Sequence, residues 1–204
     1  MFLFRYFLMF LMFSFTGWLI EVIYVYKDQK ILVNRGFLFG PYCPIYGFGF
    51  ILISIFLNKY YNYPTVVFME SLFICLILEY ITSYILEMLF NEKWWDYTNR
   101  KYNINGRVCL ETLIPFGVFS LLTLYVFKPL FLSIICLLDN NIIIVMSCLL
   151  FIMYVVDSIS TIYIKNKLKK INYRYKENKL LKREINEINR NNKQLYQRVN
   201  RDDF

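Results

Sequence analysis

The chain has 204 residues, 58% of them hydrophobic and 20% aromatic, whereas a soluble domain is about 45–50% apolar. It contains no histidine and no CxxC pair, which excludes most zinc sites, Ser-His and Cys-His nucleophile pairs and haem ligation by histidine. The net charge of +8 is confined to residues 165–204, which carry 13 Lys/Arg against 5 Asp/Glu; no nucleic-acid-binding module accompanies it, so we expect no nucleic-acid partner.

Hydrophobic residues gather in blocks of about 18–25, the length that crosses a hydrocarbon core of about 30 Å. We therefore predict an all-α, polytopic membrane protein of about five transmembrane helices, with a transmembrane domain over 1–164 and a basic, cytoplasmic helical tail over 165–204. The expected spans are about 2–26, 46–57, 65–90, 110–127 and 142–164.

Two stretches need a separate interpretation. The first block is expected to be an uncleaved span rather than a signal peptide, because Glu21 interrupts its end and no small-residue cleavage site follows. Residues 128–139 form a shorter apolar piece, interpreted as an interfacial helix; a sixth crossing there would break the alternation of charge described below.

The segment 36–49 is rich in glycine and proline. It contains four glycines and two prolines, so it cannot be a regular helix throughout. Irregular backbone at membrane depth survives only where protein or water satisfies its polar groups. We expect a broken or re-entrant segment that leads into the second span.

Basic residues alternate between the two sides of the predicted membrane. The connections after spans one and three carry three and four Lys/Arg and the tail carries 13, whereas the opposite side has only Arg5, Lys59 and Lys128. Because cytoplasmic loops carry the excess of Lys and Arg, we expect a multi-pass protein of the cell membrane with its N-terminus outside and its C-terminus in the cytoplasm. The basic tail is also attracted to anionic lipids of the bilayer.

The tail has a heptad-like pattern. Apolar or core-compatible residues lie at 164, 168, 171, 175 and 178, and then at 181, 185, 188, 192, 195 and 199. This pattern indicates either a short coiled coil for self-association or partner docking, or an amphipathic helix lying on the bilayer.

Acidic residues inside predicted spans are costly, at about 2.5–3.5 kcal/mol or more for each charged carboxylate. The acids in question are Glu21, Glu70, Glu79, Glu87, Glu111 and Asp157. The four other than Glu70 and Glu79 lie near the predicted cytoplasmic ends of four different helices, and the two cytoplasmic connections supply arginines at the same face. These groups form either ion pairs that hold the helix ends together or a polar chamber open to the cytoplasm.

Glu79 lies at mid-depth in the third span, and no Lys or Arg within the spans neutralises it. We expect it to be either a protonated carboxyl hydrogen-bonded to a neighbouring helix or part of an ion or proton path. At about 100° per residue, Glu79 and Glu87 are about 80° apart and can face one pocket, whereas Glu70 is about 180° from Glu79.

The connection after the third span contains two further patterns. Trp94-Trp95-Asp96-Tyr97 is typical of an aromatic belt at the membrane interface. The segment 103–107 has turn chemistry, because Asn-Gly tolerates positive φ. A metal site of two cysteines and one glutamate near this face is conceivable, but we predict no metal and no cofactor.

Several sequence blocks occur in a fixed order within residues 13–125. They are Gly17-Trp18 with Glu21, 34–38, 40–47, Glu79-Tyr80, 94–97 and 105–110. In these blocks the chain resembles the bacterial CmpB-like, type IV family of ABC-transporter permeases. The resemblance implies a permease but brings no established cargo or catalytic residue, and it leaves the tail outside. Because the two cytoplasmic connections are the family's signature, it favours the chamber over simple ion pairs.

We therefore expect a transport-type role, as a permease component with a polar chamber open to the cytoplasm. The chain has no GxxxxGK[ST] run, so ATP-driven transport needs a separate ATPase subunit. The alternatives are a membrane-embedded enzyme acting on a lipid or isoprenoid-like substrate, and a non-catalytic scaffold that recruits a partner through its tail. The predicted polar cluster is Glu21, Arg35, Glu79, Asp96, Arg107 and Glu111, with Asn34, Glu87, Trp94, Trp95, Asn105 and Asp157 as secondary candidates.

Overall fold

The structure is a computed structural model that describes the backbone of residues 1–202. The surroundings of the side chains are described for these residues except 28–29, 172, 176, 184–186, 189 and 191–202. The chain divides into two compact units, Met1–Thr161 and Ile162–Phe204.

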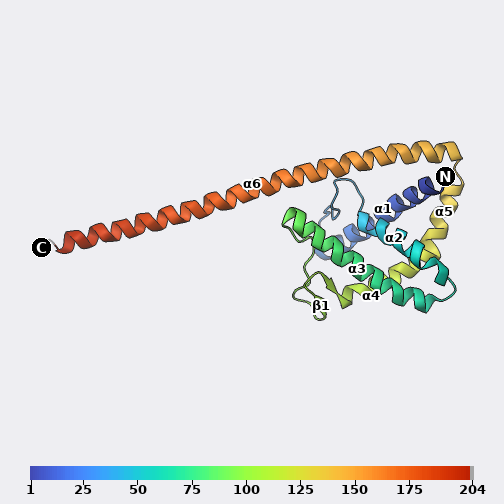
Figure 1. Ribbon diagram of the computed structural model, residues 1–204, viewed down its shortest axis with the longest axis horizontal. Helices are drawn as coiled ribbons and strands as arrows, with labels where there is room; N and C mark the ends of the chain where they lie inside the picture. Colours follow the sequence, from blue (N-terminus) through green and yellow to red (C-terminus); the bar gives the residue numbers. More distant parts are fainter. Residues whose placement is uncertain (203–204) are drawn as a thin grey trace. The chain divides into compact units, whose positions relative to one another are not determined.

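Most of the regular structure is helical (Figure 1). In residues 1–202 the α-helices are α1 (Phe2–Gln29), α2 (Pro44–Phe56), α3 (Pro64–Phe90), α4 (Leu110–Leu122), α5 (Lys128–Cys136) and α6 (Asn140–Asp202). They are accompanied by a 3-10 turn, η1 (Asn58–Tyr60), and a π-helical segment, η2 (Thr123–Phe127). A short antiparallel hairpin pairs β1 (Asn103–Ile104) with β2 (Val108–Cys109).

Within the described residues, four helical runs are long and apolar enough to cross a membrane: Phe2–Lys27, Pro64–Phe90, Leu110–Cys136 and Asn140–Arg183. The helix α2 is also apolar, but its 13 residues give about 20 Å of helix, less than a hydrocarbon core of about 30 Å. Residues 31–43 before it are not helical, as predicted for the Gly/Pro-rich segment. The predicted all-α membrane fold is confirmed.

The fourth span continues beyond its predicted end at Phe127. The helical run passes from α4 through η2 into α5 without an intervening loop, because Pro129 occupies the first turn of α5, where proline is tolerated. The wider turns of η2 accompany a change of direction between α4 and α5, visible in Figure 1. Residues 128–136 are therefore an extension of the fourth span and not a separate piece.

The second unit is the continuation of α6, which passes residue 164 without a break. The predicted heptad positions with described side chains include Leu168, Ile171, Tyr175, Leu181 and Ile188, and each of these is about half exposed or more. Positions 185, 192, 195 and 199 lie outside the described side chains.

The largest buried side chains of the first unit meet where α1 packs on α2. Phe13 and Phe50 stack with ring centroids 4.3 Å apart, and Ile135 of α5 and Ile143 of α6 complete the cluster. Because lipid tails are as apolar as these side chains, helices in a membrane associate through close packing and small residues.

Two glycines let aromatic rings approach helix backbones. A Cβ on Gly17 of α1 would lie 2.2 Å from the ring of Tyr46, and one on Gly117 of α4 would lie 2.7 Å from the ring of Phe68. Both contacts need the absence of a side chain, so these glycines determine how closely α2 approaches α1 and how closely α3 approaches α4.

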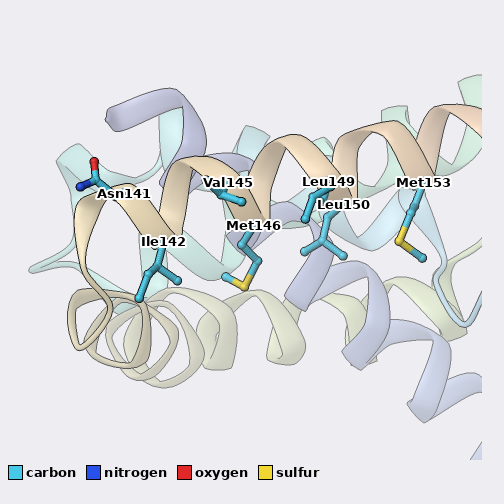
Figure 2. A pocket seen from close by; sticks show the side chains of 7 residues that line it. All are labelled: Asn141, Ile142, Val145, Met146, Leu149, Leu150 and Met153. Carbon is cyan, nitrogen blue, oxygen red and sulfur yellow. The ribbon is translucent and has the colours of Figure 1, made fainter.

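The membrane part of α6 has an open apolar groove on one side (Figure 2). Steps of three and four residues place its lining on one helix face. The lining consists of Ile142, Val145, Met146, Leu149, Leu150 and Met153, with Asn141 at one end. This composition is that of a lipid-facing surface, and the polar site lies elsewhere.

The variant Gly17→Ala tests the packing of Tyr46 against α1. Its new methyl group collides with the tyrosine ring, so we expect a loss of about 1–3 kcal/mol of stability, measured as a lower melting temperature in detergent. The matched control is Gly49→Ala, whose Cβ would meet only Leu78 at 3.6 Å. Equal melting temperatures for the two variants would contradict this packing.

Candidate functional site

Two non-helical connections, residues 30–43 and 91–109, meet at one end of the first unit. The ring of Phe37 lies 5.4 Å from that of Phe90 and 5.6 Å from that of Trp94, measured between centroids. The predicted site residues lie on these connections or on the helices beside them, so the site is built up from these two segments.

Asn34 holds the first connection in shape. Its Oδ1 accepts hydrogen bonds from Trp18 Nε1 at 2.8 Å and from the Gly36 amide at 3.1 Å. Its Nδ2 donates to the carbonyls of Phe39 at 3.0 Å and Leu38 at 3.3 Å. These bonds use the amide completely, which makes Asn34 a structural residue of the connection.

Asp157 of α6 ties the same connection to the helical bundle. Its Oδ2 accepts the Gly40 amide at 2.9 Å and the Tyr42 hydroxyl at 2.5 Å, while Oδ1 accepts the Thr161 hydroxyl at 3.3 Å. Burial, together with the hydrogen bond to Asp157 and its charge, raises the pKa of Tyr42 well above its usual range. The phenol therefore remains a donor at physiological pH.

Asp96 shapes a turn in the second connection. Its Oδ1 accepts the Thr98 amide at 3.0 Å and the Thr98 hydroxyl, and its Oδ2 lies 3.7 Å from Lys93 Nζ. The bonds from Thr98 lower the pKa of this exposed carboxyl. Gly106, at φ 68°, packs so closely here that a Cβ would lie 2.8 Å from Asp96 Oδ1. Asp96 is thus engaged in its own turn.

Arg107 fastens the second connection to α3. Its Nη2 lies 2.5 Å from Glu87 Oε2, and its Nη1 donates to the Ser83 hydroxyl at 3.2 Å. The rings of Tyr80 and Tyr84 lie 5.8 and 5.4 Å from the guanidinium carbon. The Arg107 side chain is only 16% exposed, so this ion pair is worth more than one in open water.

Two further bonds shape and dock this connection. Within it, the Trp95 indole donates to the carbonyl of Arg107 at 2.8 Å, and the Asn105 amide donates to the Tyr80 hydroxyl of α3 at 3.0 Å. Asn105 adopts φ 53°, as expected from its turn chemistry. With the connection docked in this way, its Tyr97 lies against the helical bundle and reaches Glu79 of α3.

Glu79 is the most deeply buried acid in the described part of the chain, with 5% of its surface exposed. Its Oε1 accepts the hydroxyl of Tyr97 at 3.2 Å, and no described group bonds its Oε2. Burial, the charge of Glu79 and the hydrogen bond raise the pKa of Tyr97 well above its usual range. The Tyr97 phenol is therefore a permanent donor to this carboxylate.

Glu21 of α1 has a similar partner. The Tyr46 hydroxyl donates to Glu21 Oε1 at 2.6 Å, and the ring of this tyrosine is the one that lies against Gly17. The carboxylate of Glu21 also acts electrostatically on Tyr97 and Glu79. We call Glu21, Tyr46, Glu79 and Tyr97 the tyrosine–carboxylate cluster.

The structure brings only some of the predicted residues together. Of the six in the predicted polar cluster, Glu21 and Glu79 join the tyrosine–carboxylate cluster, and Arg107 of the second connection is bonded to α3. Glu111 pairs instead with Arg100 at 3.3 Å, with both side chains more than half exposed. Arg35 is exposed and makes no ion pair with a described residue.

Sequence reasoning missed the two tyrosines of the cluster as site residues. Both lie within the blocks that carried the family resemblance, Tyr46 within the Gly/Pro-rich segment and Tyr97 after the tryptophan pair. Tyrosine near a membrane end is common, so composition does not separate these two from interfacial tyrosines. Only their contacts do.

The cluster combines two acids with two hydroxyl donors. Neither Glu21 nor Glu79 takes part in an ion pair among the described residues. No three His, Cys, Asp or Glu side chains gather as a metal site in the part of the chain that the structure describes. The chemistry that this arrangement offers is the binding of a proton or another single positive charge.

Replacing Arg107 by glutamine tests how the second connection is held. We expect a loss of about 1–3 kcal/mol of stability, because the partly shielded ion pair with Glu87 is broken. The matched control is Arg100→Gln, whose exposed pair with Glu111 contributes about 0–1 kcal/mol. Thermal unfolding in detergent measures both, and an equal loss in the two variants would show that Arg107 has no special role.

Asp157→Ala tests how the first connection is held, with Cys43 as the reporter. Burial and the nearby charge of Glu21 raise the pKa of the Cys43 thiol to about 12, so little reactive thiolate exists at pH 8. Freeing the connection exposes this thiol and lowers its pKa, so we expect labelling by a maleimide to accelerate about tenfold or more.

The labelling is measured in a protein whose other four cysteines are replaced by serine. Ser158→Ala is the control, because the Ser158 hydroxyl bonds Tyr154 of its own helix and not the first connection. A labelling rate that is unchanged in Asp157→Ala would mean that Asp157 does not hold the connection closed.

Comparison with known protein families matches residues 8–162 to the family described as "Putative ABC-transporter type IV". The match covers about three quarters of the chain and leaves the tail outside. No curated protein and no solved structure matches the chain. The family expected from the sequence blocks is confirmed, and the chain belongs to the putative ABC-transporter type IV family.

Proposed function

We propose that the protein is a permease component of a transporter in the cell membrane, and that the tyrosine–carboxylate cluster is the polar site through which it handles its cargo. The family match supports a transporter-type membrane protein. The permease role is more specific than the family match, and it rests on the acidic side chain buried inside a membrane helix.

The observation that carries the proposal is the burial of Glu79. This acid lies inside a span of 27 residues, is 5% exposed and has one oxygen without a described partner. An acid at this depth destabilises the fold unless it is paired, and such acids typically mark ion or substrate paths. Non-helical backbone beside it, in the two connections, is the pattern found where transporters bind ligands.

The proposal retains the predicted polar chamber and assigns different roles to its residues. Glu21 and Glu79 line its inner end, and Arg107 holds the connection that closes it. Arg35, Asp96 and Glu111 are on the exposed side, where a cargo from the aqueous phase arrives first. In this proposal the chamber opens where the two connections meet and ends at the cluster.

We propose that this open end faces the cytoplasm, with the N-terminus outside and the C-terminus inside. The support is the distribution of basic residues, because the connections at this end and the tail carry almost all Lys and Arg of the chain. Arg5 and Lys128 lie near the other end, where they bond Asn140 and Asn58.

A separate ATPase subunit is the proposed energy source, since the chain has no phosphate-binding GxxxxGK[ST] run. The exposed heptad positions of the second unit suit self-association through a short coiled coil. Neither partner is needed to form the cluster, which lies wholly in the first unit.

The enzyme alternative has less support. It needs arginines free to hold a phosphate, but Arg107 is already bound to Glu87 and Ser83 and covered by two tyrosine rings. The scaffold alternative places the function in the tail, so it requires that removal of residues 170–204 abolish function.

Proteoliposomes test the transport role. We expect the protein, reconstituted with its co-purified subunits and supplied with ATP, to move at least one solute of a panel of alkali cations, organic ammonium compounds and amino acids. Glu79→Gln is expected to slow this flux about tenfold or more, because it removes the interior charge.

Glu70→Gln is the matched control, since Glu70 lies on the same helix but is exposed. It is expected to transport at the wild-type rate. Failure to move any solute, with or without the co-purified subunits, would contradict the proposed function, and so would equal flux in the two variants.

A further inference from the structure

We propose that the tyrosine–carboxylate cluster binds one monovalent alkali cation in exchange for a proton. This inference deepens the proposed function and rests on it for its biological meaning, since it makes a cation the cargo or the coupling species. The binding itself can be measured without transport.

The first reason is an enclosed oxygen atom without a partner. Oε2 of Glu79 is completely buried and has no hydrogen-bond partner among the described groups, although Oε1 of the same carboxylate is bonded by Tyr97. A buried acceptor left unsatisfied costs about 1–3 kcal/mol, and more when it is charged. A cation bound at this atom removes that cost, and a bound proton removes the part of it that comes from the charge.

The second reason is the charge of the cluster. Glu21 and Glu79 act on each other electrostatically inside the membrane part of the protein, where like charges repel strongly. The tyrosine hydroxyls stabilise both carboxylates but bring no positive charge. One added positive charge halves the uncompensated charge, and neither acid is ion-paired with a Lys or Arg among the described residues. Arg107 is paired with Glu87 instead, and Arg35 acts with Glu21 on Cys43.

The third reason is the kind of atoms available. The groups that the cluster offers to a cation are carboxylate and phenol oxygens, which suit hard cations rather than copper, zinc or iron. The nearby Cys75 thiol is occupied by the Ser120 hydroxyl at 3.7 Å. Two acids are fewer than a dry divalent site requires, and no three metal-binding side chains gather within the described residues. A monovalent cation fits this set.

Among the titratable groups around Glu79, only the carboxylates exchange a proton near neutral pH. The titratable groups that act on it or are acted on by it come from α1, α2, α3 and the second connection: Glu21, Tyr46, Cys75 and Tyr97. Phenols and a buried thiol keep their protons at neutral pH, so the carboxylates are the groups that change state.

The exchange is balanced in atoms and charge. When the cation enters, the O–H bond of the protonated carboxyl breaks, the proton leaves to water, and the cation takes its place beside the carboxylate. The net charge of the cluster is the same before and after. No oxidant, reductant or other reactant takes part.

Proton release on adding salt measures this exchange. The purified protein is placed in nanodiscs of uncharged phosphatidylcholine, in weak buffer with a pH indicator, and choline chloride is replaced by NaCl or KCl at constant ionic strength. We expect saturable release of protons, stoichiometric with the protein. The half-saturating salt concentration is expected to rise about tenfold for each unit by which the pH is lowered.

Glu79→Gln is expected to abolish the release and Glu70→Gln to leave it unchanged, and the sodium and potassium arms identify which cation binds. The proposal is overturned if neither salt releases protons, or if Glu79→Gln releases as many as the wild type.

A second pair of variants avoids dependence on the folding of Glu79→Gln. Tyr97→Phe removes one oxygen of the cluster, and we expect about fivefold to tenfold weaker cation binding, as for one lost hydrogen-bonding partner. Tyr80→Phe removes a hydroxyl that bonds Asn105 outside the cluster and is expected to bind as the wild type. Equal binding by both variants would also overturn the proposal.

The two proposals fail in different ways. Cation-dependent proton release in a protein that moves no solute would retain this inference and overturn the transport role. Solute flux without any effect of sodium or potassium on proton binding would retain the transport role and overturn this inference.

Discussion

The carboxylate of Glu79 lies within an apolar helix, almost completely enclosed and with no ion pair among the described residues, and much of the first unit is arranged around this fact. Inside a membrane such a group has to find its partners in the protein. Its described partner is Tyr97, which belongs to the connection 91–109 and not to a helix. Placing that phenol requires the connection to fold back against α3, and Arg107 fastens it there through Glu87 and Ser83. One buried acid thus explains why a polar connection is docked and structured.

On the other side of the cluster, the partner tyrosine of the second acid is also positioned by contacts elsewhere in the first unit. Tyr46 reaches Glu21 because Gly17 leaves room for its ring against α1. The first connection, which leads into α2, is tied to α6 by Asp157. Small residues and hydrogen bonds carry these contacts, as expected in lipid, where burial of apolar surface gives little preference for one helix neighbour over another.

Acids and arginines at this end of the protein therefore have two different roles. The charged pairs, Arg107 with Glu87 and Arg100 with Glu111, fix connections to helices, and the second pair does so in open water. The acids bonded by tyrosines have no such pairing. A phenol stabilises a carboxylate without neutralising it, and this leaves the carboxylate able to accept a proton or a cation.

Hydrophobic blocks, the Gly/Pro-rich segment and the motif blocks determined by themselves that the chain is an all-α membrane protein of this family, because spans depend on local composition and helix length. They also identified Glu79 as an acid that needs an explanation. The extension of the fourth span through η2 was not predicted, since Lys128 and Pro129 are typical of a break. Tertiary structure alone decided which acid meets which partner. Arg107 pairs with Glu87, while Glu21 and Glu79 accept hydrogen bonds from tyrosines 25 and 18 residues away in the chain. Spacing along a helix predicts a shared face, but the partner across from that face depends on how the connections fold back.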